Sequence, residues 1–186
     1  LHSDASYLYE TRARSRAGGH FFLSDAPSDH HTPPVFLPPL NGPIHTVSKI
    51  LDVVVGSAAE AEIGATYVNG QEAVPIRITL AELNHPQPPT PMQVDNTTAE
   101  GFANETIKQK RSKAMDMRFH WIRDRVRQKQ FLVYYRPGVT NLGDPFTKHL
   151  SPAATKIMRP FYLHADQDSP TAQLANVVIN HLVQGC

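Results

Sequence analysis

Four carboxylate side chains occupy positions where predicted strands end or predicted helices begin. Asp4 lies in the first predicted strand, and Glu62 lies in the first turns of the helix that follows three strands. Asp95 ends a later strand, and Asp144 comes near the start of a late helix. Functional groups of open α/β sheets gather at strand ends around a switch in strand order. Four carboxylates gathered there repel one another unless a cation neutralises them, and such hard oxygen ligands suit Mg²⁺ or Mn²⁺ rather than zinc.

Two glutamates compete for the role in the first predicted helix. Ser57 and Glu60 have the spacing of a capping box, in which the serine hydroxyl and the glutamate side chain each accept a backbone N–H at the start of the helix. Residues two apart on a helix differ by about 200° in direction, so Glu60 and Glu62 cannot face the same site. We therefore assign Glu60 to the cap and Glu62 to the site.

The surrounding pattern predicts the elements that would position these groups. The spacing of apolar and turn residues predicts two strands joined by a turn within 3–23, a proline-rich loop over 24–43 and a strand within 44–55. A helix from 57 to 84, with a break near Gly70, and a strand at 92–94 follow. The rest of the chain is predicted to form a helix over about 112–128, a strand at 131–136, a short helix over 141–148 and a helix at 151–163. This order, β-β-β-α-β-α-β-α, predicts an α/β fold with a mixed sheet flanked by helices.

Charge is distributed unevenly along the chain. Residues 1–107 carry 5 Lys and Arg against 12 Asp and Glu, whereas residues 108–129 carry 9 against 2. An acidic part beside a short basic segment is typical of a carboxylate site next to a polyanion track, although a solvated helix face without a partner gives the same pattern. Trp121 in this segment lies beside an apolar stripe, which favours a core role over stacking on a base.

Length and composition limit the class of protein. The chain has 186 residues, of which 40% are hydrophobic and 19% charged, so it can build a core and is not fully disordered. It has one cysteine, Cys186, which excludes a module held by internal disulfides. No apolar run approaches the roughly 20 residues that a membrane-spanning helix needs.

Four segments of the chain resemble a known family. Residues 3–7 (SDASY), 57–62 (SAAEAE), 94–99 (VDNTTA) and 141–148 (NLGDPFTK) have the order and spacing of motifs in the ribonuclease H domain of copia-type LTR retrotransposon polyproteins, in which that domain follows reverse transcriptase. The resemblance covers about residues 1–160. It therefore implies a ribonuclease H-like domain over 1–160, with a first strand truncated at the N-terminus, and a tail of unknown role over 161–186.

The resemblance also implies a fold, an activity and a set of ligands. The fold would be a five-stranded mixed sheet flanked by helices, and the activity would be endonucleolytic cleavage of the RNA strand of RNA–DNA hybrids during reverse transcription. Asp4 would bridge two Mg²⁺ ions, for which Mn²⁺ could substitute, while Glu62 and Asp95 complete one site and Asp144 the other. The implied partners are the hybrid and the reverse transcriptase domain of the same polyprotein, inside the cell in a cytoplasmic virus-like particle or in the nucleus.

Nucleic-acid contacts are expected from two places. Next to Asp95, a small polar pair is expected to reach the sugar edge, and the basic segment is expected to hold the strand backbone. The predicted contact residues are Asn96, Thr97, Lys108, Lys110, Arg111, Lys113, Arg118 and Arg125.

An alternative hypothesis is a catalytically inactive, nucleic-acid-binding remnant of the same domain. Ribonuclease H domains commonly carry a histidine shortly before the last aspartate, and residues 134–142 contain none. The short segment before Asp4 also favours the remnant, whereas the presence of all four acids favours the enzyme.

Overall fold

A computed structural model describes residues 1–23, 42–107, 120–164, 166 and 168–184. Its five strands are β1 (His2–Glu10), β2 (Arg14–Phe21), β3 (His45–Ile50), β4 (Thr90–Val94) and β5 (Phe131–Tyr135). They form one sheet in the order β3-β2-β1-β4-β5. The pairs β1–β2 and β2–β3 are antiparallel, and the pairs β1–β4 and β4–β5 are parallel. The predicted α/β fold with a mixed sheet is therefore confirmed, and the chain switches sides of β1 between β3 and β4.

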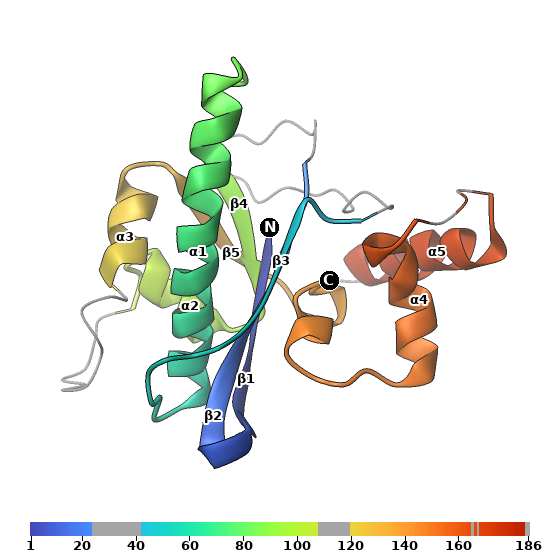
Figure 1. Cartoon of the computed structure of the whole chain (residues 1–186), viewed down its shortest axis with the longest axis horizontal. Helices are drawn as coiled ribbons and strands as arrows, with labels where there is room; N and C mark the ends of the chain where they lie inside the picture. The colour runs from blue at the N-terminus through green and yellow to red at the C-terminus, as the bar shows by residue number, and fades with distance from the viewer. Residues whose placement is uncertain (24–41, 108–119, 165, 167, 185–186) are drawn as a thin grey trace.

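Helices cover both sides of the sheet. On one side lie α1 (Ala58–Glu82), α2 (Thr97–Ala103) and α3 (His120–Arg127), and on the other lie α4 (Pro152–Tyr162) and α5 (Pro170–Gln184), as Figure 1 shows. Within the described ranges, no helix is both long enough and apolar enough to cross a bilayer. Residues 161–186, predicted as a tail, include the end of α4 and all of α5.

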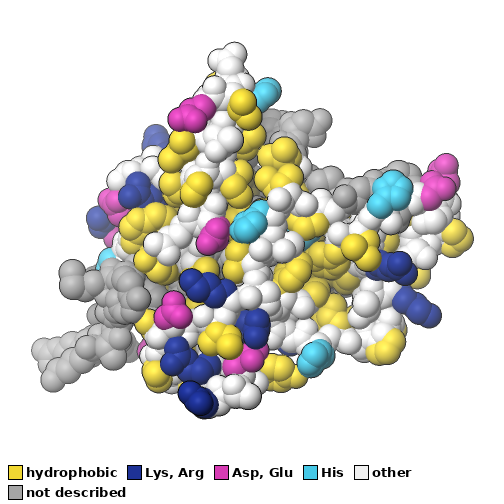
Figure 2. Space-filling model, in the orientation of Figure 1, with side chains coloured by type: hydrophobic (Ala, Val, Ile, Leu, Met, Phe, Trp, Pro, Cys, Tyr) yellow, Lys and Arg dark blue, Asp and Glu magenta, His cyan; other side chains and the backbone are white. Residues whose placement is uncertain are grey.

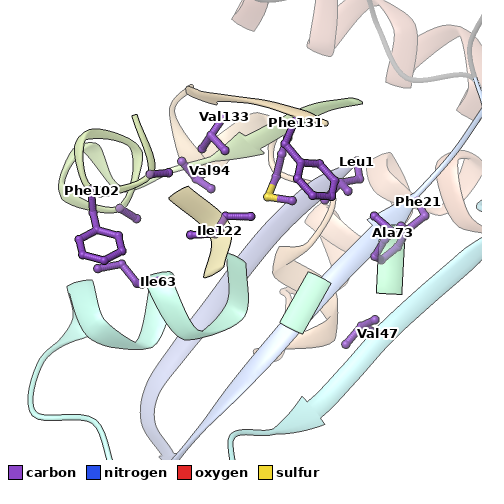
Figure 3. Close-up of a cluster of buried hydrophobic side chains, with 13 residues drawn as sticks. Leu1, Phe21, Val47, Ile63, Ala73, Val94, Phe102, Ile122, Phe131 and Val133 are labelled. Atoms are coloured by element: carbon purple, nitrogen blue, oxygen red, sulfur yellow. The ribbon is translucent and has the colours of Figure 1, made fainter. Parts of the chain in front are cut away.

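The larger core lies between the sheet and helices α1 to α3. Figure 3 shows Phe102 and Ile63 in contact range, with Ile122, Val94 and Val133 nearby; all five are buried. These side chains come from three helices and two strands. Their burial away from water therefore holds α1, α2 and α3 against β4 and β5, the parallel half of the sheet. A separate small cluster of Leu142, Phe161 and Ala175 joins α4 and α5 to the chain after β5.

Helix α1 is continuous, so the predicted break near Gly70 is wrong. The helix runs to Glu82 and also accommodates Pro75. Gly70 has a packing role instead, because a Cβ there would lie 3.0 Å from Trp121 Cζ3 and 3.1 Å from Ile122 Cδ1. The absence of a side chain lets α3 approach α1 closely. Trp121 packs against the larger core, as predicted.

The short helix predicted over 141–148 is also wrong. The chain forms two 3₁₀ turns, Gly138–Thr140 and Asp144–Phe146, with an irregular segment between them. Asn141 accounts for the irregularity, because its Nδ2 donates to the Ser3 carbonyl (2.8 Å) and its Oδ1 accepts from Gly143 N (2.9 Å). These bonds tie residues 141–148, called loop 141–148 below, to the start of β1.

Part of the predicted helix over 112–128 lies outside the described residues. Helix α3 begins at His120, and residues 108–119 are not described. The apolar stripe predicted for this helix consists of Met115, Phe119, Ile122 and Val126. Ile122 is fully buried, and Val126 packs against the core. Met115 and Phe119, the other two members, are among the residues that the structure leaves undescribed.

Candidate metal centre

The site forms where β1 and β4 diverge. The two strands pair in parallel at His2 and Gln93, and Asp4 lies two residues further along β1. Asp4 is almost fully buried, with 1% of its surface exposed. Its neighbour across the antiparallel pair is Gly18 on β2. Asp4 thus lies at the switch in strand order, where open α/β sheets commonly place functional groups.

Glu62 reaches this position from the first turns of α1. Because β1 and β4 separate beyond His2, the backbone N–H of Ala5 is available, and it donates to Glu62 Oε1 (3.1 Å). The other carboxyl oxygen, Glu62 Oε2, is buried without a hydrogen-bond partner among the described residues. Such an atom lacks the pairing that buried polar groups normally have, so it is available to a ligand.

The choice between the two glutamates is supported by the start of α1. Ser57 Oγ accepts from Glu60 N (3.2 Å), as a capping box predicts. The Glu60 carboxylate accepts from Gly56 N (2.7 Å), one residue before the position that we expected. Glu60 is therefore occupied at the cap, and Glu62 faces the sheet.

Asp95 completes the group directly after β4 ends at Val94. Its side chain is half-buried and lies against Gly138, where a Cβ would come within 2.6 Å of Asp95 Oδ2. A larger residue at that position would displace the carboxylate. Glycine at 138 thus leaves room for Asp95 at the strand end.

Asp4, Glu62 and Asp95 form the carboxylate triad. One oxygen from each lies within 4.8 Å of the other two. Oxygen atoms on opposite sides of a Mg²⁺ ion are about 4.2 Å apart, so small side-chain rotations would place all three on one ion. The spacing, the all-oxygen donors and the unpaired Glu62 Oε2 fit a hard divalent cation.

The triad is electrostatically unfavourable without a cation. Burial, followed by the charge of Asp144, raises the pKa of Asp4 to about 7, even though a hydrogen bond from Thr147 lowers it. Burial, followed by the charges of Asp4 and Asp95, raises the pKa of Glu62 to about 9. Burial and Asp144 also raise the pKa of Asp95. A divalent cation would relieve the repulsion and release protons.

Asp144, the fourth predicted ligand, lies beside the triad rather than in it. Its charge acts on both Asp4 and Asp95. Its Oδ1, however, is 2.9 Å from the Lys148 ammonium, and apart from this ion pair the oxygen is buried without a hydrogen-bond partner among the described residues. Burial works against the charged form of Lys148, but the hydrogen bond to Asp144 and the nearby carboxylates raise the pKa of Lys148 overall.

Sequence reasoning missed Thr147 and Lys148 as site residues. The Thr147 hydroxyl donates to Asp4 Oδ2 in a very short hydrogen bond, and the same hydroxyl is 3.0 Å from the carbonyl of Asp144. Thr147 therefore links the first carboxylate to the loop that carries the fourth. Both residues stand in the quoted segment NLGDPFTK, which was the available signal.

Most of the predicted nucleic-acid contacts are untested. Lys108, Lys110, Arg111, Lys113 and Arg118 lie outside the described residues. Asn96 caps α2, since its Oδ1 accepts from Thr98 N (2.9 Å) and Ala99 N (3.2 Å), and Thr97 is exposed beside it. The Arg125 guanidinium lies 4.9 Å from the centre of the Trp121 ring.

An open hollow of about 570 Å³ adjoins the site through Lys148. It lies between residues 145–150 and α4, and its lining includes Lys148, His149, Met158, Arg159 and Tyr162. Cationic groups line it together with apolar ones, which would suit a ligand that carries both phosphate and apolar surface. The hydroxyl of Tyr162 donates to the Leu142 carbonyl (2.9 Å), which ties α4 to the chain after β5.

No protein-family model matches the chain, and no solved structure matches it.

Proposed function

We propose that this chain is a metal-dependent endoribonuclease that cleaves the RNA strand of RNA–DNA hybrids, as in the ribonuclease H domains of copia-type retrotransposons. The observation that carries the proposal is the carboxylate triad. One oxygen each of Asp4, Glu62 and Asp95 lies within 4.8 Å of the other two, at the point where β1 and β4 diverge. Three buried or half-buried carboxylates whose pKa values are raised by burial and by neighbouring carboxylates are typical of a functional site rather than of a stabilising one.

The fold supports the same proposal. Three antiparallel strands are followed by two parallel ones, with helices on both sides of the sheet. The acids occur along the chain in the order Asp, Glu, Asp, Asp that the resemblance implies, on β1, in α1, directly after β4 and in the 3₁₀ turn Asp144–Phe146. Many unrelated functions share such sheets, so the fold adds weight only together with the triad.

Each side chain of the site has a defined task in this proposal. Asp4, Glu62 and Asp95 would hold Mg²⁺, or Mn²⁺ in its place. Thr147 fixes one oxygen of Asp4, and the N–H of Ala5 fixes one oxygen of Glu62, so that the remaining oxygens face a common point. When bound, the ion supplies Lewis-acid chemistry that activates water and stabilises charge on phosphate oxygens.

The reaction is a hydrolysis. Water adds to the phosphorus of a phosphodiester, the bond from phosphorus to the 3′-oxygen breaks, and the products carry a 5′-phosphate and a 3′-hydroxyl. The hollow beside Lys148 places Arg159 where its charge can attract the polyanionic strand. The proposed partners are therefore the hybrid and, in a polyprotein, a reverse transcriptase domain.

The test is cleavage of a hybrid by the full chain. The RNA strand carries a 5′ label, and the reaction contains Mg²⁺. We expect internal cuts whose products end in a 3′-hydroxyl, and no cuts in single-stranded RNA or duplex DNA. Asp4→Asn and Asp95→Asn should each reduce the rate by at least about 10²-fold, whereas Asp52→Asn, an exposed carboxylate paired with Lys49 on the surface, should leave it unchanged.

Binding without cleavage would contradict the enzymatic proposal. If the wild-type chain binds the hybrid but cuts no faster than Asp95→Asn at any Mg²⁺ or Mn²⁺ concentration, the chain is a binding remnant of the domain. Equal cleavage by the wild type and by Asp95→Asn would point to a contaminating nuclease and would also reject the site.

A further inference from the structure

A second divalent ion beside the triad would need Asp144. Paired metal ions in hydrolytic sites lie about 3.5–4 Å apart and are bridged by a shared carboxylate. Asp4 is placed to be that bridge, because it belongs to the triad and feels the charge of Asp144. Asp144 lies on the loop that is tied to Asp4, because the Thr147 hydroxyl bonds both Asp4 Oδ2 and the Asp144 carbonyl. Asp144 is therefore the acid placed to complete a second ion.

Asp144 is already paired with a cation of the chain itself. Lys148 Nζ lies 2.9 Å from Asp144 Oδ1, one helical turn further along the chain. The side chain of Asp144 is only 18% exposed, so the pair is partly shielded from water and holds more firmly than a surface ion pair. Thr147, the residue before Lys148, is bonded to Asp4, which fixes the direction from which the lysine approaches.

The charge of Lys148 reaches the whole site. It is the cation that acts on Asp4, on Glu62 and on Asp95, and in each case it lowers the pKa of the carboxyl. A lysine ammonium is a compact point charge with three donors, so it can neutralise a carboxylate without the fixed geometry that Mg²⁺ demands. Lys148 thus supplies positive charge where a second ion would otherwise lie.

We propose that Lys148 is the second cation of this site, and that the chain binds one divalent ion at the triad instead of two. The proposal rests on the metal centre of the proposed function and changes the number of divalent ions that this centre binds. Lys148 acts as a positioning residue: it pairs with Asp144 and keeps a positive charge beside the triad.

The test counts bound ions by calorimetric titration of the full chain with Mn²⁺. We expect one ion per wild-type chain. Lys148→Met should raise the number to two, because Asp144 is then free to bind an ion that Asp4 shares. Lys49→Met is the matched control, since Lys49 also pairs with an aspartate, Asp52 at 3.8 Å, but on the exposed surface. It should leave the number at one.

Two further variants identify the ligand that is freed. Lys148→Arg keeps the charge and should keep one ion. Lys148→Met combined with Asp144→Asn should return the number from two to one. Lys148 is 43% exposed, so these changes leave the core intact, and the wild-type count needs no variant at all.

Two ions on the wild-type chain, one ion on Lys148→Met, or no bound ion would each overturn the proposal. The outcome is separable from that of the nuclease test. Two bound ions together with hybrid cleavage would reject the role of Lys148 and keep the proposed function. One ion on the wild type and two on Lys148→Met, without any hybrid cleavage, would keep the role of Lys148 and reject the proposed function.

Discussion

At the level of a single residue, the burial of Glu62 lowers the free energy of unfolding. Only 7% of its surface is exposed, and Glu62 Oε2 has no hydrogen-bond partner among the described residues. Burying an unpaired carboxyl costs on the order of 1–3 kcal/mol even when the group is neutral, and more when it is charged. A cation bound at this oxygen, as we propose, would offset that cost.

The stability contributed by Asp4 and Glu62 without added cation should fall as pH rises. The pKa of Asp4 is raised from 3.8 to about 7 and that of Glu62 from 4.5 to about 9, so these two carboxyls hold more protons in the folded than in the unfolded chain. The buried amino terminus, His2 and His20 have lowered pKa values and act in the opposite direction, so the effect is isolated by comparing the wild type with Glu62→Gln. Urea unfolding of both chains at pH 5, 7 and 9 should show the wild type losing stability relative to Glu62→Gln as pH rises.

Mg²⁺ should reverse this trend, because it binds the deprotonated triad. The stabilisation by Mg²⁺ should therefore grow from pH 5 to pH 9. A wild type that gains stability relative to Glu62→Gln as pH rises without divalent ions, or a Mg²⁺ effect that is the same at all three pH values, would contradict the burial of these carboxyls.

The two glutamates of α1 should respond differently to the same change. Glu62→Gln should raise the metal-free stability at pH 7, because the native carboxyl must bind a proton that the unfolded chain does not hold, and it should abolish stabilisation by Mn²⁺. Glu60→Gln should cost about 0.5–1 kcal/mol through the weakened bond to Gly56 N and should keep the Mn²⁺ effect. Thermal unfolding with and without Mn²⁺ distinguishes them, and the reverse pattern would move the site to Glu60.

At the level of elements, loop 141–148 reaches the triad only because β2 has a glycine opposite Asp4. A Cβ at Gly18 would lie 2.6 Å from Thr147 Cγ2 and 2.7 Å from the Gly143 carbonyl oxygen. Gly18→Ala should therefore cost about 1–3 kcal/mol and displace Thr147 from Asp4. Urea unfolding together with Mn²⁺ affinity measures both effects.

Gly56→Ala is the control for that substitution. A Cβ at Gly56 would meet only Glu60 Oε2, at an ordinary 3.4 Å. It should change stability by no more than about 0.5 kcal/mol. Equal tolerance of alanine at both positions would show that the loop does not pack against β2 as described.

The strands, the start of α1 and the selection of Glu62 could be predicted from the sequence, because each depends on neighbours within a few residues. Period-two alternation marks strands, and Ser57 with Glu60 marks the helix start at a fixed spacing. The direction of Glu62 then follows from helix geometry. Such local rules predict which strand or helix carries each carboxylate, but they do not predict how many carboxylates converge on one point.

The contacts that finish the site could not be predicted in this way. Thr147 reaches Asp4 across 143 positions, and Asn141 reaches Ser3 across 138. These bonds override the local helical tendency of 141–148, just as packing against Trp121 explains Gly70 inside a continuous α1. The Lys148–Asp144 pair has helical spacing, but its importance is visible only once Asp4 lies beside it.

At the scale of the whole molecule, the distribution of Lys and Arg on the surface determines where a polyanion could bind. Figure 2 shows Lys and Arg side chains on the viewed face interspersed with Asp and Glu. Ion pairs between described residues include Arg16–Glu10 and Lys49–Asp52. On α3, Arg127 is paired with Glu105. Arg159, in contrast, lines the hollow beside Lys148 and is exposed.

Removing the charge of Arg159 should weaken hybrid binding. In an Asp95→Asn background, which prevents cleavage, Arg159→Gln should lower affinity about 3- to 10-fold at moderate salt. It should also reduce the slope of log affinity against log salt by about one, as expected for one lost phosphate contact. Lys49→Gln in the same background should change neither quantity, and an unaltered salt slope for Arg159→Gln would place the strand elsewhere.

The convergence of three carboxylates on one cation is most directly tested by anomalous scattering from crystals of the full chain grown with Mn²⁺. The account predicts an anomalous peak within bonding distance of one oxygen each of Asp4, Glu62 and Asp95, with Lys148 still paired to Asp144. The absence of a peak at the triad, while Mn²⁺ scatters at other positions of the same crystal, would contradict it.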